Sequence, residues 1–228
     1  VFNRVIKDAN AKLLGWRDVP VKSDAIGELA RTTEPFMRQV FIARGIFTDD
    51  EFERRLYVIR KCAERAVRES AIEGREYFYI PSLSSSTIVY KGLLLPHQIP
   101  QYYQDLTDSS VTSGLALVHS RFSTNTFPTW PLAHPYRYIC HNGEINTLKG
   151  NVNWMRARQG RLNTELFGED MQKLFPIVYE NQSDSACLDN ALEFLVLGGR
   201  SLPHAMMMLI PEPWVANPQM DLDRRGFY

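Results

Sequence analysis

HSRFSTNTFPTW, residues 119–130, is the stretch around which the rest of this sequence is organised. Upstream of it, apolar Leu115 and Leu117 share a face with Arg121 under the two-residue alternation of a β-strand. A buried strand is therefore expected over residues 115–121, with Arg121 at its end.

A second polar stretch, HNGEINT, follows at residues 141–147. A strand is expected over residues 136–141, and it leads into Asn142 and Gly143. Both residues of such a pair tolerate positive φ, which favours a tight hairpin turn. The two polar stretches are therefore expected to meet where their strands end.

These strand ends carry groups that fit acyl-transfer chemistry on an amino-acid substrate. Arg121 is suited to binding a carboxylate through two parallel hydrogen bonds. The Asn142 side chain and the Gly143 N–H together form a two-donor site for a developing oxyanion. Each residue alone also fits a structural explanation, because an Asn-Gly pair most often only turns the chain and a strand-end arginine most often lies in solvent. His119 alone fits a hydrogen-bonded core residue, and His141 fits a role in the hairpin.

The two stretches, continued by GNVNWMR at residues 150–156, resemble the glutamine amidotransferase domain of glutamate synthase large subunits. The resemblance covers nearly the whole chain, because shorter motifs also match. They are GWRDVP (15–20), QVFI (39–42), FERRLY (52–57), STIVYKG (86–92), SDSA (183–186) and GRSL (199–202).

The expected fold class is α+β. Strands are expected at residues 76–83 and 86–94 as well as around the two motifs, and helices lie outside these blocks, which argues against a doubly wound parallel sheet. The resemblance makes this specific, because it implies a four-layer αββα sandwich of the N-terminal nucleophile hydrolase type. Residues 1–228 are expected to form a single glutamine amidotransferase domain that is incomplete at both ends and lacks the first strands of the sandwich.

Local signals predict the other elements. A helix is expected over residues 1–14, closed by Gly15. Thr48 begins a capping box that opens a long amphipathic helix of about five turns. The remaining expected elements are a turn or short strand at 16–21, helices at 25–31, 151–158 and 184–197, a strand at 38–43, and a short helix through 206–208.

The resemblance also implies the reaction, which is hydrolysis of L-glutamine to glutamate and ammonia. The nucleophile in such domains is an N-terminal cysteine whose own α-amino group acts as the base. This sequence begins with Val1. The nucleophile is therefore expected in a preceding segment of a longer protein, and the 228 residues alone are expected to be inactive.

Residue roles follow from the resemblance. Arg121 is expected to hold the α-carboxylate of glutamine, and Thr124 with the backbone from Phe122 to Asn125 to shape that end of the pocket. Related aminosugar-forming enzymes have a tryptophan and a histidine where this chain has Phe122 and Asn125.

Two further roles concern the reacting amide and the substrate ammonium. The resemblance assigns the oxyanion hole to Asn142 and Gly143, and binding of the α-ammonium to Asp184. By sequence alone, Asp184 has an equally good explanation as the cap of the helix that begins there.

Two other functions stay open. The first is a glutamine-binding module without catalysis, which would keep Arg121, Asn142 and Asp184. The second is an unrelated cysteine hydrolase that uses Cys187, near a helix N-terminus that can lower a thiol pKa, or Cys140. In a strand, Cys140 and His141 point to opposite faces and cannot form a catalytic pair.

Composition limits the partners. The chain has 26 basic and 26 acidic residues, so no net charge attracts nucleic acid or an anionic membrane. Three widely spaced cysteines favour a reducing compartment over a disulfide framework or a zinc site. The cytoplasm of a bacterium or the stroma of a plastid fits this composition.

The resemblance implies no cofactor for this domain. Neither a cluster-binding cysteine set nor a glycine-rich phosphate loop is present in the sequence. FMN and an iron–sulfur cluster are expected in the rest of the parent protein, where a separate flavin domain would combine the ammonia with 2-oxoglutarate. The expected partners are L-glutamine, those remaining domains, and a small electron-donating subunit or ferredoxin. The sequence leaves the electron donor open.

Overall fold

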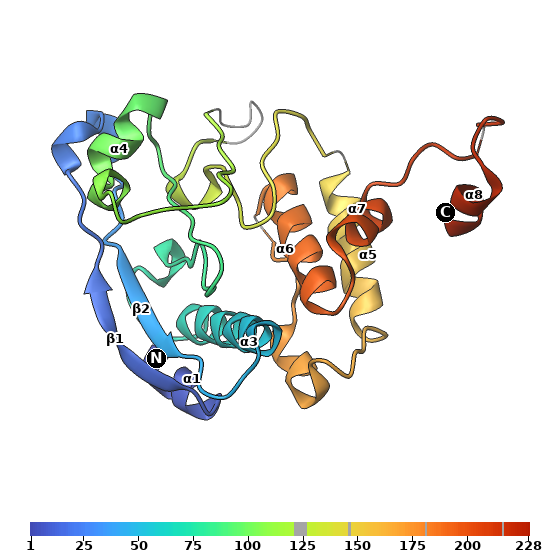
Figure 1. The fold of residues 1–228 in the computed structure, drawn as a ribbon, viewed down its shortest axis with the longest axis horizontal. Coiled ribbons are helices and arrows are strands. Elements are labelled where there is room, and N and C mark those ends of the chain that lie inside the picture. Colours follow the sequence, from blue (N-terminus) through green and yellow to red (C-terminus); the bar gives the residue numbers. More distant parts are fainter. Residues whose placement is uncertain (121–126, 146, 181, 216) are drawn as a thin grey trace.

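The computed structural model describes residues 1–120, 127–145, 147–180, 182–215 and 217–228. In these residues helices are combined with one two-stranded antiparallel sheet, so the fold is of mixed, α+β type. The sheet lies on one side of the molecule beside helices α1 (Phe2–Asp8) and α3 (Asp49–Arg68) (Figure 1). Helices α5 (Leu148–Gln159), α6 (Asp184–Leu197) and α7 (Leu202–Leu209) lie together on the other side (Figure 1).

The sheet pairs β1 (Lys12–Asp18) with β2 (Arg38–Ala43), and the latter agrees with the expected strand. The helix expected over residues 1–14 is shorter: α1 covers Phe2–Asp8. It ends there because Asn10 takes a left-handed conformation with φ of 52° and the following residues pair with β2. Gly15 is therefore not a helix cap. It lies inside β1, next to a bulge in the register.

Helix α3 (Asp49–Arg68) begins with the predicted capping box. The Thr48 hydroxyl accepts a hydrogen bond from the Glu51 N–H at 3.4 Å, and the Glu51 carboxylate accepts one from the Thr48 N–H at 2.9 Å. The apolar side of α3 packs on α1, where Ile59 and Ala63 contact buried Ile6. Both the local signal and the burial of one face thus fix this helix.

Replacing Thr48 by alanine is expected to cost about 0.5–2 kcal/mol of local stability, because the first turn of α3 loses its side-chain acceptor. Hydrogen exchange of the α3 amides in the full-length protein measures this loss as faster opening. Thr87→Ala, an exposed threonine outside any helix, is the matched control. Equal exchange of α3 in the wild type and in Thr48→Ala would contradict the prediction.

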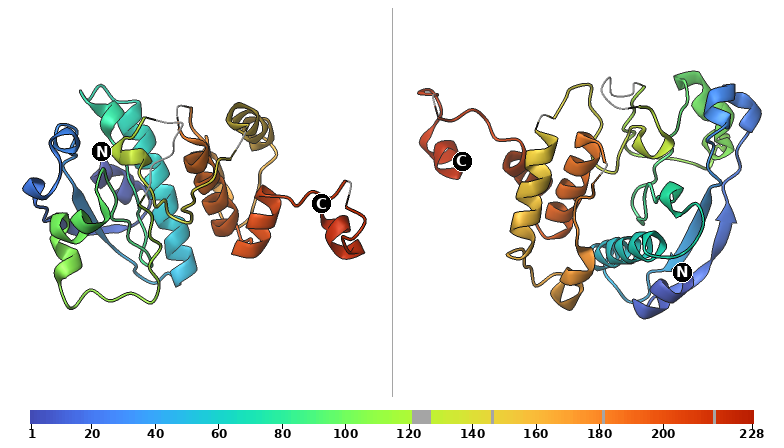
Figure 2. Two further views of the ribbon diagram at one scale, coloured as in Figure 1. Left: turned by 90° about the horizontal axis from the view of Figure 1, so that it is seen from above. Right: turned by 180° about the vertical axis from the view of Figure 1, so that it is seen from behind.

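The other helices are mostly short. The longer ones agree with the sequence, because α5 (Leu148–Gln159) ends at Gly160 and α6 (Asp184–Leu197) has the predicted bounds. The remaining helices are α2 (Glu28–Arg31), α4 (Ile99–Tyr102), α7 (Leu202–Leu209) and α8 (Leu222–Phe227). Helix α8 stands apart from the rest at the end of an extended segment (Figure 2).

The strands expected at 76–83, 86–94, 115–121 and 136–141 do not form within the described residues. A strand needs a neighbouring strand to bond its peptide groups. Here those groups bond locally or to side chains: the Val89 N–H donates to the Ser82 hydroxyl, and the Tyr136 N–H donates to the Ile139 carbonyl across a bend. No second sheet therefore forms in the described part of the chain, and the four-layer sandwich stays a prediction.

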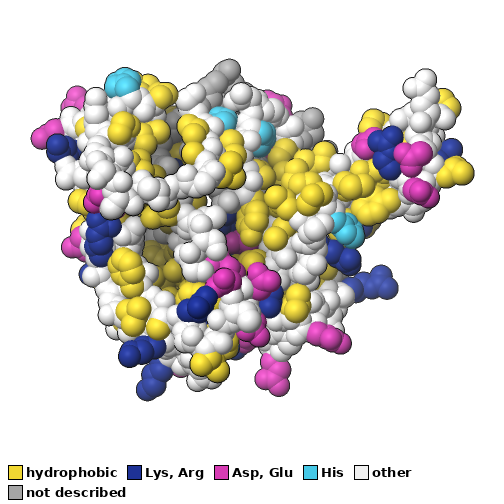
Figure 3. All heavy atoms as spheres, viewed as in Figure 1, with side chains coloured by type: hydrophobic (Ala, Val, Ile, Leu, Met, Phe, Trp, Pro, Cys, Tyr) yellow, Lys and Arg dark blue, Asp and Glu magenta, His cyan; other side chains and the backbone are white. Residues whose placement is uncertain are grey.

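Large apolar side chains remain on the surface. Leu115, Val118 and Phe127 are each more than two-thirds exposed, at 84%, 71% and 86%. Apolar side chains also gather over the region of α6 and α7 (Figure 3), where Leu202 and Met208 of α7 are exposed. Among the described helices, none combines the length and the apolar character needed to cross a membrane.

Candidate functional site

The N-terminus of α6 is the centre of the candidate site. Its cap is Ser183, whose hydroxyl accepts a hydrogen bond from the Ala186 N–H at 3.1 Å. Asp184 is therefore not the capping residue. One of its carboxylate oxygens instead accepts a hydrogen bond from the Ile145 N–H at 2.7 Å, and the other accepts one from the Ser185 N–H at 2.7 Å. Asp184 thus ties the HNGEINT stretch to the helix.

The two polar stretches do meet, as the sequence predicts. His119 Nε2 lies 2.9 Å from Asn142 Oδ1, and the Cys140 thiol lies 3.7 Å from the Val118 carbonyl oxygen. When His119 carries its proton on Nε2, it donates to Asn142 Oδ1. The two N–H groups of the Asn142 amide are then directed away from His119 and are available to a substrate oxygen.

Asn142 and Gly143 are exposed, as oxyanion donors must be before substrate arrives. The predicted hairpin turn is wrong, however. Neither residue has positive φ, and the chain makes an open bend there, because residues 136–141 are irregular, with a bend at 137–138, and form no strand that could return as a hairpin. Asn142 is held by its contact with His119, and the chain after Gly143 is held to α6 through the Ile145 N–H, without a β-ladder.

The four substrate-binding residues predicted from the HSRFSTNTFPTW stretch, Arg121, Phe122, Thr124 and Asn125, lie outside the described residues. Their flanks are described, since His119 contacts Asn142 directly before them and Trp130 is buried after them. Of the seven predicted site residues, the structure therefore places Asn142, Gly143 and Asp184.

Three histidine rings lie beside these residues. The ring centre of His134 is 4.6 Å from that of His119 and 5.4 Å from that of His141. His141 Nε2 is 2.7 Å from the Ser185 hydroxyl, which adds a second link between this loop and α6. Burial, with the nearby charges of His119 and His141, lowers the pKa of His134 from 6.5 to about 4.

This lowered pKa predicts a pH dependence of stability. His134 stays neutral in the folded protein while the unfolded chain binds a proton below its ordinary pKa of 6.5. Stability is therefore expected to fall as the pH drops from 6.5 to about 4. The melting temperature of the full-length protein across this range measures the effect. His134→Phe keeps an aromatic ring and should make the slope shallower, and an unchanged slope would contradict the assignment.

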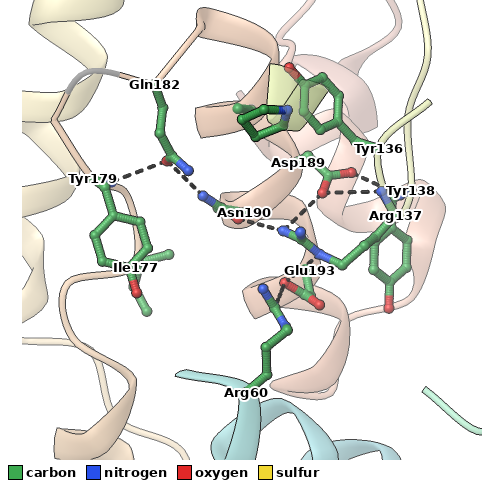
Figure 4. Close-up of polar contacts among 12 residues, drawn as sticks. Arg60, Tyr136, Arg137, Tyr138, Ile177, Tyr179, Gln182, Asp189, Asn190 and Glu193 are labelled. Atoms are coloured by element: carbon green, nitrogen blue, oxygen red, sulfur yellow. Dashed lines mark hydrogen bonds and ion pairs between the residues drawn. The ribbon is translucent and has the colours of Figure 1, made fainter. Parts of the chain in front are cut away.

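A buried charged cluster behind the loop was not predicted. Arg137 forms ion pairs of 3.0 Å with both Asp189 and Glu193, which lie one turn apart on α6 (Figure 4). Glu193 also pairs with Arg60 of α3, and Arg137 donates a hydrogen bond to Asn190. The available signal was the presence of these acidic residues inside an otherwise apolar helical sequence, since charged residues in such positions are buried only when they are paired.

None of the three cysteines has the surroundings of a nucleophile. Burial raises the pKa of the Cys187 thiol to about 11, with Asp184 acting in the same direction, so the helix N-terminus does not activate it. Burial also raises the pKa of Cys62. Cys140 faces a carbonyl oxygen, while the neighbouring His141 bonds to Ser185. Among the residues that the structure describes, no group of histidine, cysteine and acidic side chains could hold a metal ion.

The sequence matches the family model of class-II glutamine amidotransferases over residues 1–228. It is 54% identical to the glutamate synthase [NADPH] large chain of Bacillus subtilis (strain 168), over all of this chain and 15% of that protein. It is 45% identical to the glutamate synthase [NADH] of Saccharomyces cerevisiae, over all of this chain and 11% of that protein. It is 42% identical to the ferredoxin-dependent glutamate synthase of Pyropia yezoensis, over 96% of this chain and 14% of that protein. The chain thus spans less than a sixth of these relatives.

Proposed function

Because this chain belongs to the class-II glutamine amidotransferases, we propose that it forms the glutaminase domain of a glutamate synthase large subunit. The reaction is hydrolysis of L-glutamine to L-glutamate and ammonia. The observation that carries the proposal is the identity of 54% over the whole chain to a glutamate synthase large chain. The contact of His119 with Asn142 supports it, because it joins the two motifs on which the resemblance rests.

In this proposal a cysteine outside the 228 residues supplies the nucleophile, since burial raises the pKa of Cys62 and Cys187 and Cys140 lacks a base among the described residues. Its thiolate attacks the side-chain amide carbon of glutamine. The Asn142 amide and the Gly143 N–H donate to the oxyanion that forms. The α-amino group of the cysteine, which has taken the thiol proton, gives it to the leaving nitrogen, so that the C–N bond breaks and ammonia leaves. Water then adds to the thioester, and the C–S bond breaks to release glutamate and the thiol.

Recognition of free glutamine uses its two α-groups. Arg121 binds the α-carboxylate, with Phe122, Thr124 and Asn125 around it, and Asp184 binds the α-ammonium. Each oxygen of Asp184 already accepts a hydrogen bond from the chain. The Oδ1 atom also accepts a hydrogen bond from the Ser185 hydroxyl at 3.1 Å, whereas Oδ2 accepts, among the described residues, only from the Ile145 N–H. The second lone pair of Oδ2 can therefore take an ammonium without breaking any of these bonds.

The fold of this domain is proposed to be the four-layer αββα sandwich of N-terminal nucleophile hydrolases, with residues 1–228 forming one domain. Further strands from outside the chain would cover the exposed side chains of Leu115, Val118 and Phe127. They would also supply ladder partners for the segments that lack them, residues 86–94 and 115–120.

The ammonia is proposed to pass to a separate flavin domain that makes a second glutamate from 2-oxoglutarate with FMN and an iron–sulfur cluster. The electron donor stays open, because relatives are named as NADPH, NADH and ferredoxin-dependent enzymes. A bacterial cytoplasm or a plastid stroma is the proposed location. One relative is a chloroplastic protein of Oryza sativa.

Substrate analogues test the proposal in the full-length protein. L-Glutamine is expected to release equal amounts of ammonia and glutamate. N-Acetyl-L-glutamine and L-glutamine methyl ester each lack one of the α-charges, so both should be hydrolysed much more slowly. Equal hydrolysis of all three would contradict recognition of free glutamine, and glutamine binding without ammonia release would favour a non-catalytic module.

A further inference from the structure

Asp189 lies completely buried in α6 and binds the backbone of the loop that leads to the oxyanion residues. One carboxylate oxygen accepts a hydrogen bond from the Tyr138 N–H at 2.8 Å, and the other accepts one from the Arg137 N–H at 3.3 Å. Two successive peptide groups are therefore held by a single side chain that cannot itself move into solvent.

The charge of Asp189 is compensated in place. The Arg137 guanidinium, whose peptide N–H Asp189 also binds, lies 3.0 Å from the Asp189 carboxylate (Figure 4). Burial raises the pKa of the Asp189 carboxyl, and the Arg137 guanidinium and the two peptide N–H groups oppose that rise. A buried charge is retained inside a protein when it is paired and hydrogen-bonded in this way. The side chain and the backbone N–H of Arg137 thus both bind the carboxylate of Asp189, which is fixed within helix α6.

The same helix holds the loop at two further points, one directly before and one after the oxyanion residues. His141 bonds to Ser185, and the Ile145 N–H bonds to Asp184. Asn142 and Gly143 lie between these contacts and are exposed. Helix α6 therefore fixes the loop on both sides of the two residues. On the upstream side Ser185 holds His141, and Asp189 holds the two peptide groups that precede it by three and four residues.

We propose that Asp189 is a positioning residue for glutamine hydrolysis: by binding the Arg137 and Tyr138 peptides, it sets where Asn142 and Gly143 stand relative to Asp184. This inference rests on the proposed function. A displacement of oxyanion donors on the order of 1 Å is enough to cost about 100-fold in rate, so a structural anchor several residues away can control kcat.

Asp189→Asn tests the inference, since asparagine has the same shape but places an NH₂ group against a peptide N–H. The expected result is a fall in kcat of about 10- to 100-fold with little change in KM for glutamine. Glu64→Gln is the matched control. Glu64, whose side chain is 12% exposed, pairs with Arg60 of the same cluster at 3.4 Å. This change therefore also converts an acid of the cluster to an amide, but the Glu64 carboxylate bonds to helix α3 and not to the loop. Its kcat is expected to stay near the wild-type value.

A double-mutant cycle with Asn142→Ala separates positioning from a general loss of structure. If Asp189 acts through the oxyanion donors, Asp189→Asn lowers kcat by a smaller factor in the Asn142→Ala background than in the wild type. The same factor in both backgrounds would overturn the proposal, and so would a wild-type kcat for Asp189→Asn. If Asp189→Asn does not fold, the cycle is run with Asp189→Glu, which keeps the charge and both acceptors but displaces the loop. An equal factor in both backgrounds, or a wild-type kcat for Asp189→Glu, would then overturn the proposal.

Different results would rule out the proposed glutaminase function and the proposed role of Asp189. Absence of glutaminase activity in the wild-type full-length protein would remove the proposed function. Normal glutaminase activity in the wild type with uncoupled or unchanged kcat in Asp189→Asn would remove only the role of Asp189.

Discussion

Asn142→Ala is expected to lower kcat for glutamine hydrolysis by about 100- to 1,000-fold while KM changes little. The reason is that, in the proposed mechanism, the Asn142 amide donates to an oxygen whose charge develops only in the transition state. In the structure its Oδ1 atom is already engaged by His119, which leaves the N–H groups for the substrate. Steady-state ammonia release from glutamine by the full-length protein measures both constants.

Two further variants separate the loss of the Asn142 donor from other effects of the substitution. Asn142→Asp keeps the size of the side chain and an acceptor for His119 but removes the donor, so it should lose as much activity as Asn142→Ala. Asn153→Ala makes the same chemical change at an exposed position of α5 and should leave kcat unaltered. A kcat for Asn142→Ala close to that of Asn153→Ala would show that this amide is no oxyanion donor.

The second large effect concerns stability. Glu193→Ala is expected to cost about 3–5 kcal/mol, because it leaves two buried arginines without their shared partner. The side chains of Arg60, Glu193 and Arg137 are only 3%, 7% and 13% exposed. Hydrogen exchange of α3 and α6 in the full-length protein reports this loss as more frequent opening of both helices, since the cluster joins them.

The control for Glu193→Ala is Glu212→Ala. Glu212 pairs with Arg224 at 3.3 Å, but about half of each side chain is exposed, so its loss should cost only about 0–1 kcal/mol. If the two variants open equally often, the buried cluster does not stabilise the contact between α3 and α6.

The elements that the sequence predicts well are those fixed by local signals. Helix α3 is specified by its capping box and its apolar repeat, and the end of α6 by Gly198. The start of α6 is predicted correctly, but its cap is Ser183 where the sequence suggested Asp184. These features act within a few residues, so they can be recognised in a single sequence. The strands predicted between residues 76 and 141 have good strand composition, but a ladder also needs a partner that composition does not specify, and the described part of the chain provides none.

The candidate site likewise has residues that local motifs predict and a residue that they do not. Asn142, Gly143 and Asp184 can be selected because their motifs are contiguous and specific, and the structure brings their segments together through Ile145. The role of Asp189 could not be predicted, since its partners lie about 50 residues earlier in the chain. Contacts between segments so distant depend on the packing of α6 against the loop, which no local pattern specifies.

The most direct test of the account is the rate of ammonia release from L-glutamine by the full-length protein, compared with a variant in which Cys62, Cys140 and Cys187 are all replaced by alanine. The account predicts that both proteins release ammonia and glutamate at similar rates, because the nucleophile lies outside these three thiols. Loss of activity in the triple variant would identify an internal cysteine as the nucleophile, and no release by either protein would contradict the glutaminase assignment itself.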